Sequence, residues 1–203
     1  MTTPFDWLKE LPPVTRVFVV CTTMVTLAVK LRLVEWYYLL YNSGLVFKEG
    51  QYWRLVTSFL FFGDFSLDWI FHMYFIVRYS RLLEETWFRH RVSDYVWLIL
   101  FSCIALLLLE PVSDNPFLGY TLTYVLVYLW SRREPYAQMN FMGLFTFRAP
   151  YFPWVLLMFS FLLTGHLPMS HLQGIGIGHV YFFLEDVWPR QGGRRWMQTP
   201  RWL

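Results

Sequence analysis

The amino-acid sequence predicts an all-α membrane protein with six transmembrane helices and both termini in the cytosol. Of its 203 residues, 56% are hydrophobic and only 15% are charged, whereas a soluble domain carries about a quarter charged residues. Residues 149–184 contain no Asp, Glu, Lys or Arg. The 11 Trp and 13 Tyr suit a protein with two membrane–water boundaries. A net charge of +3 is too small to indicate nucleic-acid binding.

Six apolar segments predict the transmembrane helices. In chain order they cover residues 17–29, 66–83, 95–109, 117–131, 153–165 and 169–188. Pro153 suits the first turn of a helix, and Pro168 separates the last two segments. We therefore divide the chain into a cytosolic or interfacial segment (1–16), a six-helix membrane domain (17–188) and a cytosolic C-terminal segment (189–203).

The distribution of basic residues predicts the orientation. Placing both tails and the second and fourth loops on one side collects every Lys and Arg except Lys30, Arg32, Lys48 and Arg54. Loops rich in Lys and Arg stay in the cytosol. Both termini are therefore predicted to be cytosolic.

Two of the segments are short for a membrane span. Residues 17–29 and 153–165 would each form a helix of roughly 20 Å, while a bilayer core is about 30 Å thick. Either these helices extend by a turn beyond the apolar run, or the bilayer thins around them. Local thinning would lower the barrier to moving polar chain across the membrane.

The connections have an interfacial character. Residues 30–65 mix aromatic and charged side chains, so we expect short helices lying in the lumenal interface. Residues 132–152 form an aromatic and basic cytosolic loop. Near the N-terminus, Phe5, Leu8 and Leu11 predict a short surface helix before Pro12-Pro13.

Four residues form candidate motifs. Trp53-Arg54 closes the first loop, where an Arg satisfies several loop carbonyls and an indole anchors at headgroup depth, a common interfacial pairing. Gly174 and Gly178 form a G-x-x-x-G in the sixth segment. Such spacing favours close helix packing over a nucleotide-binding loop, because no strand precedes the glycines and they lie in an apolar helix.

A set of polar residues within or beside the apolar segments marks a candidate substrate path, because intramembrane polar groups often line one. The members of this set are Asp68, His72, Ser160, Thr164 and Gln173. Ordinary hydrogen bonding between helices, or segment ends near water, is the alternative interpretation. The five histidines form no metal-binding pattern, and we expect no metal and no cofactor.

The catalytic pattern of rhomboid proteases is half present. His171, Gly174 and Gly178 match the spacing of the rhomboid catalytic helix. Aligning the fourth segment as in rhomboids puts Gly119 or Tyr120 where the catalytic serine belongs, and no serine lies between Ser113 and Ser131. A base without a nucleophile performs no acyl transfer, so we expect no protease activity and interpret His171 as an interfacial residue.

The chain resembles the Derlin family over nearly its whole length. The matching motifs are Asp6-Trp7…Leu11-Pro12…Thr15-Arg16; Phe47…Gln51-Tyr52-Trp53-Arg54-Leu55…Phe59…Phe62-Gly63; Tyr79-Ser80…Leu83-Glu84 with Asp94-Tyr95; Tyr151-Phe152-Pro153-Trp154-Val155-Leu156; and Gly178-His179-Val180-Tyr181-Phe182-Phe183 followed by Pro189, Gly192-Gly193-Arg194 and Thr199-Pro200. The combination of the Gly178–Phe183 block with Trp53-Arg54 is specific.

This resemblance implies a rhomboid-like pseudoprotease of the endoplasmic reticulum membrane. It implies retrotranslocation of misfolded proteins to the cytosol for ubiquitin–proteasome degradation, through a channel or half-channel that thins the membrane. The lumenal loop and a lateral gate between the second and fifth helices would engage the substrates. An active intramembrane protease using His171, or a scaffold that only recruits ligase and substrate, are the alternatives.

The implied partners are an HRD-type ubiquitin-ligase membrane complex or other Derlins, and an AAA ATPase of the valosin-containing type. Derlins that bind this ATPase directly carry an F-x-G-x-G-x-R-L-like motif in a disordered tail, which this sequence lacks before Leu203. We expect either indirect recruitment through partners or a tail beyond this sequence. A homo- or hetero-oligomer is expected.

Overall fold

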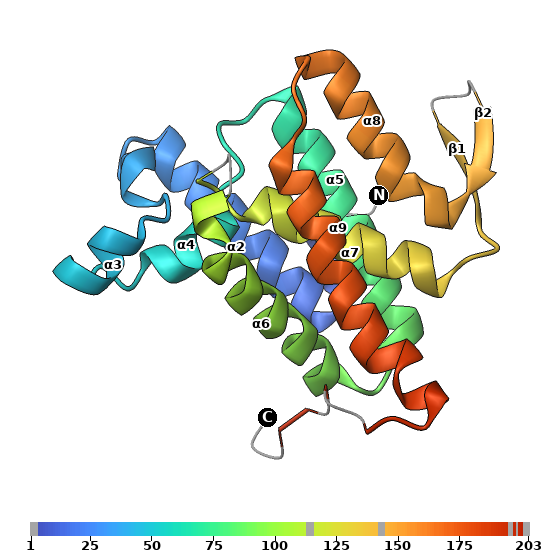
Figure 1. The fold of residues 1–203 in the computed structure, drawn as a ribbon. Coiled ribbons are helices and arrows are strands. Elements are labelled where there is room, and N and C mark those ends of the chain that lie inside the picture. The colour runs from blue at the N-terminus through green and yellow to red at the C-terminus, as the bar shows by residue number, and fades with distance from the viewer. Residues whose placement is uncertain (1–3, 113–115, 142–144, 195–196, 198, 201–203) are drawn as a thin grey trace. The chain divides into compact units, whose positions relative to one another are not determined.

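The structure, a computed structural model, describes residues 4–112, 116–141, 145–194, 197 and 199–200. The chain divides into two compact units, Met1–Val96 with Asn115–Tyr120, and Trp97–Asp114 with Thr121–Leu203. We call them unit 1 and unit 2 and describe each separately. Both are mainly helical (Figure 1).

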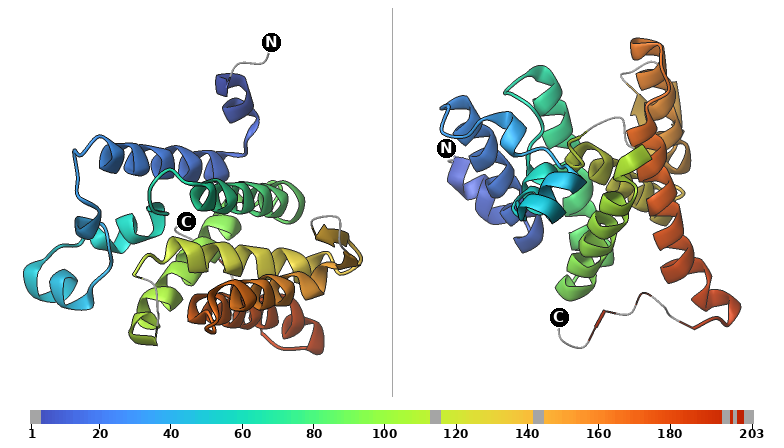
Figure 2. Two further views of the ribbon diagram at one scale, coloured as in Figure 1. Left: turned by 90° about the horizontal axis from the view of Figure 1, so that it is seen from above. Right: turned by 60° about the vertical axis from the view of Figure 1, so that its left-hand side comes forward.

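Unit 1 is a helical unit built around α2. Its elements are α1 (Pro4–Glu10), α2 (Pro13–Lys30), the 3-10 helix η1 (Trp36–Tyr38), α3 (Ser43–Glu49), α4 (Arg54–Leu60), α5 (Leu67–Leu82), the π-helix η2 (Leu83–Trp87) and the start of α6 (Val92–Leu108). Helix α2 packs against α4 and α5, and it lies beside α5 in both views of Figure 2. The short helices η1, α3 and α4 confirm the helical character predicted for the first loop.

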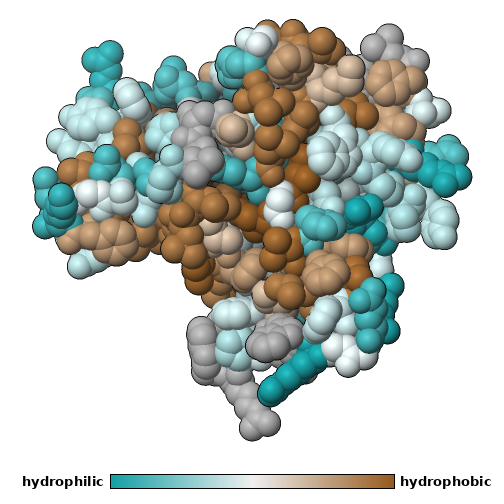
Figure 3. Space-filling model, viewed as in Figure 1, coloured by the Kyte–Doolittle hydropathy of each residue, from teal (hydrophilic) through white to brown (hydrophobic). Residues whose placement is uncertain are grey.

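Unit 2 contains the rest of the chain. Its elements are the remainder of α6, the 3-10 helix η3 (Glu110–Val112), α7 (Gly119–Arg133), β1 (Gln138–Phe141), β2 (Phe145–Arg148), η4 (Ala149–Tyr151), α8 (Phe152–Thr164), α9 (Met169–Phe182), the π-helix η5 (Phe183–Val187) and η6 (Pro189–Gln191). Helix α8 packs against α9. On the face shown in Figure 3, hydrophobic side chains follow α9, and hydrophilic ones gather near its C-terminal end.

The loop after α7 contains a β-hairpin, while the described part of the chain is otherwise mainly helical, consistent with the all-α prediction. Strands β1 and β2 form an antiparallel hairpin in which Gln138 pairs with Arg148 and Met139 with Phe147. From the sequence, residues 132–152 were predicted to form an aromatic and basic cytosolic loop, and no strands were predicted there. The hairpin satisfies backbone amides and carbonyls of this loop, because a two-stranded ladder supplies their hydrogen-bond partners.

The two segments predicted to be short for a membrane span, residues 17–29 and 153–165, form helices of different length. Helix α2 starts at Pro13 rather than at residue 17, because proline fits the first helical turn, and its 18 residues span about 27 Å. The expected extension by a turn is therefore right for this segment. Helix α8 keeps the predicted short length, with 13 residues or about 20 Å, and ends at Gly165 in the left-handed conformation.

By length and composition, one helix in the described part of the chain could cross a membrane, Pro13–Lys30. The helical stretches Val92–Leu108 and Ala149–Thr164 are apolar but shorter. The other predicted segments also form helices, α5, α7 and α9, and α5 and α9 continue into π-helices. The number of spans and the side of the termini stay predictions.

Helix α2 has an inverted distribution of polarity. Its buried face carries Thr15, Thr22 and Thr26, whereas Val17 and Met24 are 61% and 65% exposed. A helix on the surface of a soluble protein has the opposite arrangement, with its polar side chains outside. Polar residues that face the bundle and apolar residues that face outward are typical of helices in lipid.

Candidate functional site

The Trp53-Arg54 motif organises the first loop of unit 1. The Arg54 Nη1 donates hydrogen bonds to the carbonyls of Tyr37 and Leu40, both at 2.8 Å, and its Nε donates to Gln51 Oε1 at 2.7 Å. Arg54 is only 3% exposed. Its guanidinium therefore holds three points of the loop together, as expected for an Arg that satisfies loop carbonyls.

The neighbouring aromatic side chains point outward. Trp53 is exposed, and its indole Nε1 donates to the carbonyl of Tyr38 at 3.3 Å. Tyr37 and Tyr38 are also exposed, and their rings lie 4.4 Å apart. A hydrogen bond with Tyr38 raises the pKa of Tyr37, so this phenol stays neutral at physiological pH. An exposed, uncharged aromatic surface is suited to a membrane interface.

Two of the predicted path residues meet Tyr120 in unit 1. The His72 Nε2 lies 3.4 Å from Asp68 Oδ1, one helical turn away on α5. The Tyr120 hydroxyl donates to the carbonyl of Phe62 at 2.8 Å and lies 3.4 Å from Asp68 Oδ2. The rings of His72 and Tyr120 are 4.2 Å apart, edge to face. We call Asp68, His72 and Tyr120 the α5–α7 polar cluster.

Gly119, beside Tyr120, packs tightly against other residues of unit 1. A Cβ at this position would lie 2.6 Å from the carbonyl oxygen of Phe59 and 2.8 Å from the Phe62 ring. The backbone there leaves no room for a side chain. Of the two positions that align with the rhomboid serine, one is thus limited to glycine, and the other holds a tyrosine that is already hydrogen-bonded.

A buried carboxylate lies at the centre of a polar network in unit 1. Glu84 in η2 accepts hydrogen bonds from the Val14 amide at 3.0 Å, the Thr15 amide at 2.9 Å and the Thr15 hydroxyl at 2.8 Å. Ser80 Oγ contacts Thr15 Oγ1 at 2.7 Å and Tyr95 OH at 2.6 Å. This network caps the N-terminus of α2, whose first amides have no partner within the helix.

No role was predicted for Glu84 from the sequence. The available signal was the resemblance itself, because Ser80, Glu84 and Tyr95 all belong to the matching motifs. The partners of Glu84 lie about 70 positions away in the sequence, so spacing could not reveal them.

The two glycines of the sixth segment pack closely in unit 2. A Cβ on Gly174 would lie 2.6 Å from Tyr124 Cβ and 2.8 Å from the Thr121 carbonyl oxygen. A Cβ on Gly178 would lie 2.9 Å from Tyr128 Cδ1. Both therefore let α9 approach α7, in agreement with the packing interpretation of the G-x-x-x-G motif. Gly176 has no atom within 4 Å of its added Cβ.

His171, the half-signature of a protease, is a buried residue of α9. Its ring centroid lies 3.7 Å from that of Tyr124, in a tilted arrangement. The close approach of α9 to α7 covers this side chain, and a position of His171 at the membrane interface stays a prediction.

The remaining path residues lie on two elements of unit 2. On α8, the Thr164 hydroxyl donates to the Ser160 carbonyl at 2.8 Å, a bond within the helix. On α9, the Gln173 Nε2 donates to the Leu109 carbonyl at 3.3 Å. Ser160 and Thr164 are thus neighbours, while Gln173 has a partner elsewhere. Among the described residues, no group of three or more His, Cys, Asp or Glu side chains could hold a metal ion.

Comparison with known proteins identifies the family. A model of the Der1-like family matches residues 11–201. The chain belongs to the Der1-like family. It is 41% identical to Derlin-2.2 of Arabidopsis thaliana and 40% identical to Derlin-2.2 of Zea mays, in each case over 98% of this chain and 85% or 84% of the relative. It is also 40% identical to a probable derlin-2 homolog of Dictyostelium discoideum, over 100% of this chain and 83% of the relative.

Membership of the Der1-like family agrees with the resemblance inferred from the motifs. Proteins of this family are rhomboid-like pseudoproteases of the endoplasmic reticulum membrane, and membership supports a role related to endoplasmic-reticulum-associated degradation. In this chain, two residues of the Gly178–Phe183 block contact one tyrosine of α7. His179 Nδ1 lies 2.7 Å from the Tyr128 hydroxyl, and Gly178 packs on the same tyrosine.

Proposed function

We propose that this protein is a non-enzymatic membrane factor that guides misfolded proteins from the endoplasmic reticulum to the cytosol. The observation that carries the proposal is the α5–α7 polar cluster of Asp68, His72 and Tyr120 in a chain of the Der1-like family. Ionisable side chains on otherwise apolar helices are expensive in lipid and commonly mark a path for polar cargo. An unfolded polypeptide is such a cargo, because its backbone needs hydrogen-bond partners.

We propose a topology of six spans with both termini in the cytosol, and contacts within unit 1 support one part of it, the alternation of the first two spans. Trp69 at the start of α5 donates to Thr26 near the end of α2 at 3.1 Å, and Thr15 at the start of α2 meets Ser80 near the end of α5. These helices are therefore antiparallel, as two successive spans must be. On this topology the α5–α7 polar cluster lies toward the lumen, where substrates arrive.

The absence of protease activity is part of the proposal. A serine protease needs a nucleophile within hydrogen-bond reach of its base. Gly119 has no room for a side chain, and the hydroxyl of Tyr120 donates to the Phe62 carbonyl. The base candidate His171 packs against the face of an aromatic ring.

Local thinning of the bilayer is supported by α8. This helix spans about 20 Å, against about 30 Å for a bilayer core. Phe161, Leu162 and Leu163 near its C-terminal end are all exposed, so they need an apolar environment. A short apolar helix is accommodated by thinning of the surrounding lipid. We propose that Ser160, Thr164 and Gln173 contribute polar groups to the path in this thinned region.

The proposed partners are an HRD-type ubiquitin-ligase membrane complex and an AAA ATPase of the valosin-containing type, recruited directly or through the ligase complex. The chain would act as a homo- or hetero-oligomer, or as half of a channel. The exposed aromatic surface around Trp53 is our candidate for first contact with lumenal substrates.

The extraction of a misfolded substrate from reconstituted vesicles tests this function. The substrate is enclosed in the lumen, and purified ATPase is supplied outside. We expect Asp68→Asn and Tyr120→Phe to slow extraction, since each removes a polar group of the cluster. Asp64→Asn is the matched control, because Asp64 is exposed just before α5 and belongs to no cluster. Wild-type rates in both cluster variants, with unchanged folding, would argue against a path through the cluster.

A fluorophosphonate probe for serine hydrolases tests the protease alternative. We expect no labelling of the wild-type chain. Labelling that disappears in His171→Ala would overturn the non-enzymatic assignment. A pure scaffold would instead cause no thinning of the bilayer around α8, and electron microscopy in nanodiscs measures that thickness.

A further inference from the structure

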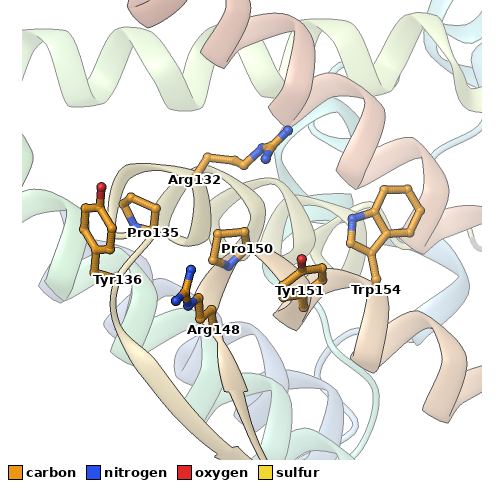
Figure 4. Close-up of a pocket in the computed structure, with 7 residues that line it drawn as sticks. All are labelled: Arg132, Pro135, Tyr136, Arg148, Pro150, Tyr151 and Trp154. Carbon is orange, nitrogen blue, oxygen red and sulfur yellow. The ribbon is translucent and has the colours of Figure 1, made fainter.

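A basic and aromatic pocket of about 550 Å³ lies in unit 2, at the turn from α7 through the hairpin to α8 (Figure 4). Its lining consists of two arginines, two tyrosines, two prolines and one tryptophan, and no acidic residue is among them. The volume falls within the range of about 300–1,000 Å³ that is usual for small-molecule sites. This pocket has no part in the proposed substrate path.

The two arginines come from different elements. Arg132 extends from the end of α7 and Arg148 from the end of β2, with Pro150 between them in the view of Figure 4. The hairpin register places Arg148 opposite Gln138 and so positions its backbone. Two cations that line one pocket without a carboxylate repel each other, and an anion bound between them would relieve that repulsion.

Arg132 is held in place by aromatic groups rather than by an acid. Its Nε donates to the Tyr128 hydroxyl at 3.0 Å, and its guanidinium carbon lies 5.6 Å from the Tyr128 ring centroid and 5.9 Å from that of Phe182. These contacts leave the two terminal amino groups for a ligand. The adjacent Arg133 makes the contrast clear, because its guanidinium is buried and paired with Asp186 at 2.9 Å.

Neither pocket arginine forms an ion pair with any residue that the structure describes, and both are exposed. Tyr136 and Tyr151, also exposed, bring hydroxyl groups to the same pocket. Guanidinium groups bind phosphate through two parallel hydrogen bonds, and tyrosine hydroxyls add single ones. The chemistry of the pocket therefore matches a phosphate group.

The pocket is continuous with an apolar stripe on α8. Trp154 lines the pocket, and Met158 and Leu162 follow at intervals of one helical turn on the same face. These three side chains are 50%, 62% and 68% exposed. A soluble phosphate compound would leave this stripe uncovered. A phosphate linked to acyl chains would fill the pocket and cover the stripe together.

We propose that this pocket binds the phosphate of an anionic glycerophospholipid, with the acyl chains lying along Trp154, Met158 and Leu162. Arg132 and Arg148 hold the phosphate, and Tyr136 and Tyr151 contact the headgroup. Anionic lipids are enriched in the cytosolic leaflet and attract basic residues at that surface. The bound lipid fixes the hairpin and the start of α8 at the level of the headgroups.

Native mass spectrometry of the full chain, purified in a neutral detergent, tests the proposal. The protein is offered phosphatidic acid, phosphatidylcholine and diacylglycerol with the same acyl chains. We expect phosphatidic acid to be retained most strongly, because the other two lipids lack a net negative charge. In Arg148→Gln we expect about tenfold weaker retention of phosphatidic acid, since one charge-assisted contact is lost. Arg132→Gln/Arg148→Gln should lose the preference for phosphatidic acid altogether.

The control is Arg89→Gln/Arg190→Gln, which removes the same charge from exposed positions outside the pocket. Equal retention of phosphatidic acid by the pocket variants and the wild type would overturn the proposal. A loss of retention in the control variant as large as that in the pocket variants would also overturn it. The last part of the experiment offers glycerol 3-phosphate and inorganic phosphate as soluble competitors of phosphatidic acid. If either competes with phosphatidic acid at equal concentration, the site binds soluble phosphate compounds and the lipid assignment is wrong. Arg148→Gln leaves the contacts of Arg132 with Tyr128 and Phe182 intact, so we expect this variant to fold normally. Weaker retention of phosphatidic acid by Arg148→Gln therefore reports on lipid binding rather than on folding.

Discussion

The two units hold their helices together by different means. In unit 1 the contacts are polar: Glu84 caps α2, Arg54 gathers the first loop, and Trp69 donates to Thr26. In unit 2 the helices α7 and α9 touch through Gly174 and Gly178. Apolar helices in lipid gain little from hydrophobic burial, so association depends on hydrogen bonds or on close backbone packing. Hydrogen bonds dominate the contacts described for unit 1, whereas unit 2 combines hydrogen bonds such as that between Tyr128 and His179 with close glycine packing. A substitution should therefore have different consequences in each.

The largest effect is expected from the polar network of unit 1. Glu84→Ala removes the acceptor of three hydrogen bonds and leaves the first amides of α2 without a partner. Hydrogen bonds to charged groups contribute most, so we expect a loss of about 4 kcal/mol in the free energy of unfolding. Thermal unfolding in detergent measures it. Glu84→Gln keeps one acceptor oxygen, so its free energy of unfolding should lie between those of the wild type and Glu84→Ala.

The neighbouring Glu85 provides a matched control for Glu84. It is exposed and pairs with Arg81 on the same helical stretch at 2.8 Å. Exposed pairs of this kind contribute at most about 1 kcal/mol. Equal destabilisation by Glu85→Ala and Glu84→Ala would contradict the role of a buried cap.

The next effect concerns the loop of unit 1. Arg54→Lys keeps the charge but replaces a planar group with a single ammonium, which cannot reach Gln51 and two carbonyls in the same geometry. We expect a loss of about 2 kcal/mol and faster proteolysis of residues 36–53. Limited proteolysis followed by mass spectrometry locates the cleavage. Arg32→Lys, an exposed change in the same loop, should leave the digestion pattern unchanged.

The glycines of unit 2 should respond in a graded way. Gly174→Ala meets a backbone oxygen and a Cβ atom, neither of which can rotate away, so we expect a loss of about 2 kcal/mol. Gly178→Ala meets mainly the Tyr128 ring, which can shift, and about 1 kcal/mol is expected. Gly176→Ala should be neutral or gain about 0.5 kcal/mol from helix propensity.

Thermal unfolding of the three alanine variants checks this order. A larger loss for Gly176→Ala than for Gly174→Ala would mean that close packing of α9 on α7 does not stabilise unit 2. The leucine variants of Gly174 and Gly178 extend the series to function, because undiminished substrate extraction in both would separate this packing from transport.

The sequence predicted the helices well and their ends less well. Apolar runs bounded by proline or charge specify helices locally, which is why α8 matches its predicted range within a residue. Helix α2 begins at Pro13, which suits a first helical turn, and Glu84, far away in the sequence, accepts hydrogen bonds from the amides of Val14 and Thr15. The proline is a local signal for this start, whereas the cap by Glu84 is a tertiary contact that no local pattern encodes.

The same distinction applies to the site and to the hairpin. Asp68 and His72 lie one turn apart on α5, so their proximity follows from helical spacing. The proximity of Tyr120 to Asp68 does not follow from helical spacing, because Tyr120 comes from a separate helix. The hairpin was missed because Met139 and Phe147 alternate with polar residues over only a few positions, and strand pairing is decided by register rather than by composition.

The smallest effect tests whether even single hydrogen bonds between helices matter in unit 1. Thr26→Val keeps the shape of the side chain but removes the acceptor for the Trp69 indole, which lies at 3.1 Å. Hydrogen bonds between membrane helices average about 0.6 kcal/mol, and we expect a loss of that size. Thr23→Val is the control, because the Thr23 hydroxyl donates to the Val19 carbonyl of its own helix at 2.8 Å. Chemical unfolding in mixed micelles resolves such differences, and a shift in Trp fluorescence would accompany only the Thr26 change. If both variants lose the same stability, unit 1 depends on its two large networks and not on polar contacts in general.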